Sequence, residues 1–230
     1  MVPELTDRNV TLGYRGLDGV VRRTVLQFAP RPRNLADGSA AFEIALAPKQ
    51  SVLLYITVGC EREPVRPRLL IFERARADAR TQLDSQVAQF CVIETGNGQF
   101  DALVKRATSD LHMMTTVLPT GPYPYAGVPW FNTPFGRDGI IAALECLWLN
   151  PSLARGVLRY LASTQAVDIV AEEDAEPGKI LHETRKGEMA ALKEMPFARY
   201  YGSVDSTPLF VVLAGAYYER TGDRSLIEAI

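Results

Sequence analysis

The hydrophobic pattern changes its period once along the chain, and this change limits the folds that the sequence can adopt. In much of residues 1–60 apolar and polar residues alternate, with the two-residue repeat of a half-buried strand. From residue 97 onward the apolar residues recur at spacings of three and four, as they do on one face of a helix. The sequence therefore predicts a β-rich part followed by a larger helical part.

Four strands are predicted in the β-rich part, at residues 9–14, 20–28, 40–47 and 50–59. Asp18-Gly19 suits a turn with positive φ between the first two strands, and Pro48-Lys49 lies between the last two. We therefore expect two hairpins. Two hairpins alone bury little surface, which indicates part of an antiparallel sandwich.

Helices are expected in the rest of the chain. Residues 69–89 are charged and favour a connecting helix, and further helices are predicted at 140–149, 153–163, 206–219 and from 225 onward. In the helix that begins at residue 97, one face is expected to be buried. This face carries Phe100, Leu103, Val104, Ala107, Leu111 and Met114.

Composition excludes several classes of protein. Hydrophobic residues make up 47% of the chain and charged residues 23%, as in soluble globular proteins. The formal net charge of -2 argues against a nucleic-acid partner, which would need a basic face. The sequence has no run of about eighteen apolar residues, and its N-terminus lacks the basic and apolar regions of a secretory signal. We therefore expect no membrane partner and a cytoplasmic location.

The metal-ligating residue types are sparse. The three cysteines are Cys60, Cys91 and Cys146, and the two histidines are His112 and His182. No two cysteines form a C-x-x-C pair, so the ligand spacing of a structural zinc site is absent from the sequence. We expect no metal and no cofactor, and we expect the cysteines to be small buried thiols.

Two long connections, residues 117–135 and 166–204, are rich in Pro, Gly, aromatic and charged residues. Connections of this length are usually functional or disordered, and the aromatic content favours function. The first contains most of the segment WFNTPFGRD, residues 130–138. Its rings suit stacking on a sugar, and Arg137 and Asp138 suit hydrogen bonds to hydroxyl groups. Alternatively, Asp138 caps a helix that begins at Gly139 and Arg137 is its ion-pair partner.

Two more segments carry chemistry. Residues 179–188, KILHETRKGE, concentrate charged groups and a histidine, and are also compatible with a solvated loop. In residues 200–208, YYGSVDSTP, Asp205 lies behind two tyrosines at the start of an apolar helix. Desolvation there could raise the pKa of Asp205 towards that of a general acid. The alternative is a helix N-cap with Pro208 in the first turn.

In order along the chain, WFNTPFGRD, HETRKGEMA, YYGSVDSTPLF and AYYERTGD resemble bacterial amylo-α-1,6-glucosidases, the glycogen-debranching type. The resemblance covers essentially the whole chain. It implies a six-hairpin glycosidase: a β-sandwich portion followed by the first helices of an (α/α)6 barrel, incomplete at both ends. The implied divisions are 1–64, the C-terminal part of an N-terminal antiparallel β-domain; 65–96, a connecting helix or linker; and 97–230, the N-terminal part of the barrel.

The resemblance also implies roles for individual residues. Asp205 would be the general acid, and Arg137 and Asp138 would hold the sugar in the −1 subsite. The other residues expected to bind substrate are Trp130, Phe131, His182, Glu183, Arg185, Glu188 and Tyr201. The implied reaction is inverting hydrolysis of α-1,6-linked glucose in glycogen or limit-dextrin oligosaccharides. The general base, a glutamate, is expected beyond Ile230, so this truncated chain is expected to be inactive.

Two other functions remain open at this stage. The same barrel could act on a different α-linked sugar, as trehalases, glucoamylases and invertases do, since fold-level resemblance does not decide the substrate. Alternatively, the chain could bind glucan without hydrolysing it. The sequence does not indicate an oligomeric state.

Overall fold

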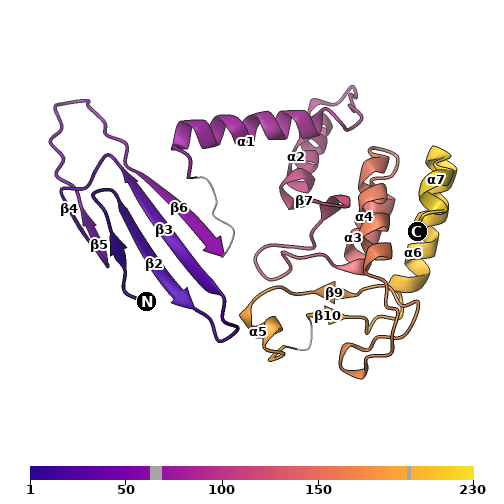
Figure 1. The fold of residues 1–230 in the computed structure, drawn as a ribbon. Helices are drawn as coiled ribbons and strands as arrows, with labels where there is room; N and C mark the ends of the chain where they lie inside the picture. Colours follow the sequence, from indigo (N-terminus) through magenta and orange to yellow (C-terminus); the bar gives the residue numbers. More distant parts are fainter. Residues whose placement is uncertain (63–68, 196–197) are drawn as a thin grey trace. The chain divides into compact units, whose positions relative to one another are not determined.

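The computed structural model describes residues 1–62, 69–195 and 198–230. They form two compact units, Met1–Thr81 and Gln82–Ile230, and each is described here by itself (Figure 1). The expected division between residues 64 and 65 lies outside the described residues.

The first unit is built on a four-stranded antiparallel sheet. Its strands are β1 (Glu4–Leu5), β2 (Asn9–Arg15), β3 (Val21–Ala29) and β6 (Tyr55–Arg62), in the order β1-β2-β3-β6. The predicted hairpin between β2 and β3 is confirmed. In its turn Gly19 has a φ of 78°, a conformation that glycine adopts without strain. Asp18 accepts a hydrogen bond from the Val20 N–H and forms a 2.6 Å ion pair with Arg22.

The second predicted hairpin is wrong. Of residues 40–47, only the first two are in a strand, β5 (Ser39–Ala41), which pairs with β4 (Asn34–Ala36). The turn forms at Pro48-Lys49, but β6 pairs with β3 instead of with the chain before the turn. Alternation specifies which side chains share a face and does not specify the neighbouring strand. The region remains rich in sheet and is compatible with a β-sandwich-like domain.

Most of the predicted helices are present. Helix α1 (Phe72–Val87) crosses the boundary of the two units, and α2 (Gly98–Met114), α4 (Pro151–Ser163) and α6 (Ser206–Thr221) match their predicted positions closely. Helix α3 (Gly136–Glu145) begins and ends earlier than expected, and α7 (Arg224–Ile227) follows α6. The closure of these helices into a barrel stays a prediction.

The core of the second unit lies where α3, α4 and α6 pack against one another (Figure 1). Two glycines allow close backbone contacts there. A Cβ on Gly136 would lie 1.9 Å from the Leu181 carbonyl oxygen, and one on Gly156 would lie 2.1 Å from that of Pro122. The fully buried members of this core include Tyr123, Ile140, Leu158, Leu161, Ile180 and Leu213.

The long connections contain short regular elements. Residues 117–135 include most of the hairpin of β7 (Thr115–Leu118) and β8 (Gly121–Pro124). Residues 166–204 include the 3-10 helix η1 (Ala171–Glu173), the strands β9 (Glu183–Thr184) and β10 (Arg199–Tyr200), and α5 (Glu188–Ala191). Strands β9 and β10 pair with each other, so backbone hydrogen bonds order the described parts of both connections.

Two burial predictions were wrong. The apolar face of α2 is not buried as a whole: Phe100 and Leu103 are exposed, and the residue that α2 buries is His112. The helix packs against β7 and β8, and the apolar spacing did not predict which of its residues are covered. Cys60 and Cys91 are exposed free thiols, and Cys146 is half-buried.

None of the helices in residues 1–62, 69–195 and 198–230 combines the length and the apolar composition that a membrane span requires. Nor do these residues bring three or more His, Cys, Asp or Glu side chains together as a metal site would require.

Candidate functional site

Arg137 and Asp205 form an ion pair between the first turn of α3 and the start of α6. Arg137 Nη1 lies 3.2 Å from Asp205 Oδ2, and Arg137 Nε lies 4.0 Å from Asp138 Oδ2. Helices α3 and α6 pack directly against each other, which holds the two chain segments together. The structure thus brings together the first and third of the segments singled out in the sequence.

The carboxylate of Asp205 does not cap its helix. Asp205 is the N-cap residue of α6, but its side chain makes no capping hydrogen bond. Ser203 Oγ instead accepts a 3.2 Å hydrogen bond from the Ser206 N–H, and donates one to Asp205 Oδ1. The Asp205 carboxylate is therefore directed at Arg137 and Ser203, and the capping interpretation does not account for it.

The pKa of Asp205 is lowered, contrary to the prediction that desolvation would raise it. The hydrogen bond from Ser203 and the Arg137 guanidinium stabilise the carboxylate, and together they outweigh desolvation. The side chain is 36% exposed, and its partial desolvation raises the pKa less than these two neighbours together lower it. Asp205 is ionised at neutral pH in this arrangement.

Asp138 does not cap a helix at Gly139, because α3 begins at Gly136 and its N-cap residue is Phe135. Asp138 lies in the first turn of α3, where a negative charge interacts favourably with the helix dipole. Its side chain remains partly exposed beside Arg137. The Asp138 carboxylate can therefore contact a ligand at the end of α3 that also carries Arg137.

The second segment lies beside the start of α3 and is not a solvated loop. The Gly136 N–H donates a 2.8 Å hydrogen bond to the His182 carbonyl, and Glu183 forms a β-bridge with Phe135. Glu183 is only 8% exposed. The His182 ring lies 5.9 Å from the rings of both Phe135 and Tyr200. These contacts place His182 and Glu183 next to the helix that carries Arg137.

Arg185 connects the second segment to the first. Its Nε lies 3.4 Å from Glu183 Oε1, its Nη1 donates to the Trp130 carbonyl, and its guanidinium lies 5.4 Å from the Phe135 ring centroid. A cavity of about 180 Å³ adjoins these groups and is lined in part by Tyr125, Trp130 and Arg185. Trp130 is 77% exposed, so most of its surface is open to a ligand.

Three predicted binding residues lie less directly at this site. Tyr201 is 2% exposed in the core, and its hydroxyl donates a 2.7 Å hydrogen bond to the Thr164 carbonyl. Glu188 is half-buried at the start of α5. The exposed Phe131 contacts Phe135 edge-on, with 5.7 Å between ring centroids.

The contribution of Ser203 and Ser206 beside Asp205 was not predicted from the sequence. Besides its bonds to Asp205 and to the Ser206 N–H, Ser203 Oγ lies 2.9 Å from the fully buried Ser206 Oγ. The two serines stand two positions before and one position after Asp205. These positions could have predicted the contacts, because short hydroxyl side chains commonly form hydrogen bonds with groups two or three residues away.

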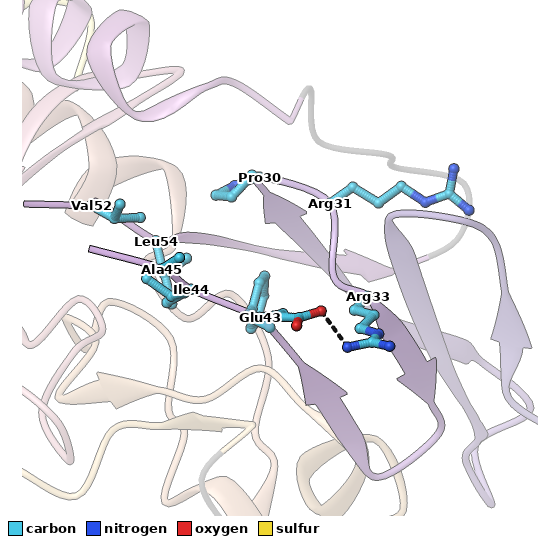
Figure 2. A pocket seen from close by; sticks show the side chains of 9 residues that line it. Pro30, Arg31, Arg33, Glu43, Ile44, Ala45, Val52 and Leu54 are labelled. Atoms are coloured by element: carbon cyan, nitrogen blue, oxygen red, sulfur yellow. Dashed lines mark hydrogen bonds and ion pairs between the residues drawn. The ribbon is translucent and has the colours of Figure 1, made fainter. Parts of the chain in front are cut away.

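A larger cavity lies elsewhere, in the first unit. It measures about 560 Å³ and lies among the residues drawn in Figure 2, around the chain before and after the Pro48-Lys49 turn. Its wall contains Arg33 and Glu43, which form an ion pair with each other, as the dashed line in Figure 2 shows. None of the residues predicted to bind or cleave substrate lines this cavity.

Residues 1–57 match the family described as the N-terminal domain of (some) glycogen debranching enzymes. No curated protein matches the chain. The matched residues all lie in the first unit, and the site residues from Trp130 to Asp205 lie outside the match. At this coarse level, the match supports a relationship to glycogen debranching enzymes and a function related to glycoside hydrolysis.

Proposed function

We propose that the chain belongs to a glycoside hydrolase that cleaves α-1,6-linked glucose in glycogen or limit-dextrin oligosaccharides with inversion. The observation that carries the proposal is the Arg137–Asp205 pair at the adjoining ends of α3 and α6. The family match adds support, because the first 57 residues of the same chain match the N-terminal domain of glycogen debranching enzymes.

In this proposal Asp205 donates a proton to the glycosidic oxygen. Inverting hydrolysis also needs a second carboxylate that activates water, roughly 6.5–9.5 Å from the first. We assign no described residue to that second role. Asp205 must acquire a proton before it can act as an acid, although its pKa is lowered in the resting arrangement. A bound sugar favours protonation in two ways: its hydroxyls compete for Arg137, and its rings exclude water from the carboxyl.

The neighbouring groups are proposed to hold the sugar. Trp130 offers an exposed ring for stacking, and Arg137 and Asp138 offer charged hydrogen-bonding groups to hydroxyls. The other proposed binding residues are Phe131, His182, Glu183, Arg185, Glu188 and Tyr201, with Tyr201 acting from the core behind the site.

A second candidate function is glucan binding without hydrolysis. The lowered pKa of Asp205 favours this candidate, because an ionised carboxylate paired with Arg137 can accept hydrogen bonds from hydroxyls but cannot donate a proton. The two candidates share their substrate class and differ in bond cleavage.

We also propose a cytoplasmic location. The exposed thiols of Cys60 and Cys91 are free, and free exposed thiols are typical of a reducing compartment.

Glucose release by the full product of the gene that encodes this chain tests the proposal. The substrates are a limit dextrin, isomaltosyl oligosaccharides, maltose, trehalose and sucrose, and proton NMR follows the anomer formed first. We expect β-glucose from the α-1,6-linked substrates. Saturable binding of the dextrin without glucose release would select the non-catalytic function, and preferred cleavage of trehalose or sucrose would refute the debranching specificity.

A further inference from the structure

A separate cavity of about 390 Å³ lies in the second unit, and none of the residues of the candidate site lines it. It is bordered by the end of α1 and the chain just after it, the end of α2, the β7–β8 hairpin and the start of α4. Its polar lining includes Gln86, Gln89, His112, Asn150 and Ser152. Its volume is in the range of small-molecule sites, roughly 300–1,000 Å³.

Two of the residues that line this cavity carry a buried polar atom with unmet hydrogen-bonding capacity. His112 is only 7% exposed, and neither its Nε2 nor Ser152 Oγ has a hydrogen-bond partner among the described residues. Buried polar groups in folded proteins are nearly always paired with protein, water or ligand. Both residues line the same cavity, so one bound molecule could supply partners to both.

The residues described around the cavity carry no formal charge. Burial lowers the pKa of His112, so its imidazole is neutral at neutral pH. A charged ligand would lose its hydration here without gaining a counter-charge. Hydroxyl groups both donate and accept hydrogen bonds, and therefore match the amides, hydroxyls and neutral imidazole that surround the cavity.

The cavity also has an apolar wall, which includes Phe90, Pro122 and Leu153. The Phe90 ring meets the His112 ring edge-on, with 4.6 Å between centroids. An apolar wall next to neutral polar groups suits a pyranose, whose ring faces are C–H surfaces and whose rim carries hydroxyls.

We propose that this cavity binds one uncharged hexose unit, held by His112, Ser152 and the neighbouring amides. The inference goes beyond the proposed function, because it requires neither Asp205 nor bond cleavage.

The test uses the two histidines of the 230-residue chain, His112 and His182, as separate reporters in imidazole ¹H–¹⁵N NMR spectra. Glucose and maltose are the neutral probes, and gluconate is the charged control. We expect the neutral sugars to shift the His112 signals saturably, also in Asp205→Asn, and gluconate to leave them unchanged. Shifts of the His182 signals report the candidate active site instead.

A pair of serine variants on α4 tests the contact. Ser152→Ala removes an unpartnered hydroxyl, so it should weaken sugar binding about tenfold without lowering the unfolding midpoint. Ser163→Ala, on the same helix, removes a hydroxyl that donates to the Tyr160 carbonyl and should leave sugar binding unchanged.

The inference is overturned if His112 does not respond to glucose or maltose, if gluconate shifts it equally, or if Ser152→Ala binds like the wild type. The first result would mean that the cavity holds water only, the second that it does not select neutral sugars, and the third that Ser152 does not hold the sugar. A response of His182 alone would support the proposed active site and refute this one. A response of His112 without glucose release by the full gene product would support this site and count against hydrolysis.

Discussion

Arg137 Nη1 and Asp205 Oδ2 lie 3.2 Å apart although the two residues are 68 positions apart in the sequence. The pair connects the first turn of α3 to the start of α6, and Ser203 holds the other oxygen of the same carboxylate. The charge state of Asp205 therefore depends on two identified neighbours.

The first prediction concerns that charge state. Arg137→Gln removes one of the groups that lower the pKa of Asp205, so this pKa should rise towards its ordinary value. A carbon-13 NMR titration of the aspartate carboxyls measures it. Arg106→Gln is the control, because it breaks the exposed Arg106–Asp110 pair on α2 and should leave the Asp205 titration unchanged. An unchanged Asp205 pKa in Arg137→Gln would contradict the electrostatic account.

The second prediction concerns acid stability and Asp18. The hydrogen bond from Arg22 lowers the pKa of Asp18 from 3.8 to about 2. A carboxylate with a lowered folded-state pKa stabilises the fold above its unfolded pKa, and the contribution is lost as the pH falls through the folded pKa. Urea unfolding from pH 5 to pH 2 should therefore show a loss of stability between about pH 4 and 2 that is smaller in Asp18→Asn. Asp7→Asn, which breaks the exposed pair with Arg31, should retain the wild-type profile.

The third prediction concerns close packing in the second unit. Gly156→Ala places a methyl group 2.1 Å from the Pro122 carbonyl oxygen, so we expect a loss of about 1–3 kcal/mol in the free energy of unfolding. Gly215→Ala is the matched control, because the space around its Cβ is open within α6. That variant should gain about 0.5–1 kcal/mol from helix propensity. Equal effects of the two substitutions in urea unfolding would contradict the packing.

The fourth prediction concerns Trp130. Because its side chain is mostly exposed, Trp130→Ala should change the free energy of unfolding by less than about 0.5 kcal/mol. Loss of stacking should weaken limit-dextrin binding by about tenfold, as measured by calorimetry on the full gene product. Trp148→Ala removes the other tryptophan, which is also exposed and lines a different cavity, and should leave dextrin binding unchanged.

The sequence predicted local features well because they depend on neighbouring residues. The Asp18-Gly19 turn and the ends of α4 and α6 lie where turn and capping residues favour them. The pairing of β6 with β3 was missed, because a two-residue period does not identify the adjacent strand. The exposed face of α2 was missed for a related reason: amphipathic spacing identifies an apolar face and not what covers it.

The candidate site was predicted in part. The expectation that the three segments share one site agrees with the contacts Arg137–Asp205, Gly136–His182 and Arg185–Trp130. The sign of the Asp205 pKa shift was wrong, because it depends on the distances to Ser203 and Arg137 and not on residue type. The burial of Tyr201 among core residues was likewise a result of packing that no local pattern reveals.

The most direct test of the proposed acid compares two substrates in Asp205→Asn, made in the full gene product. An isomaltosyl oligosaccharide needs a proton on its leaving oxygen, whereas α-glucosyl fluoride has a leaving group that departs without one. If Asp205 is the proton donor, hydrolysis of the oligosaccharide falls by about 10²–10⁴-fold, while hydrolysis of the fluoride stays near the wild-type rate. Equal losses on both substrates, or no loss on the oligosaccharide, would contradict the assignment of Asp205.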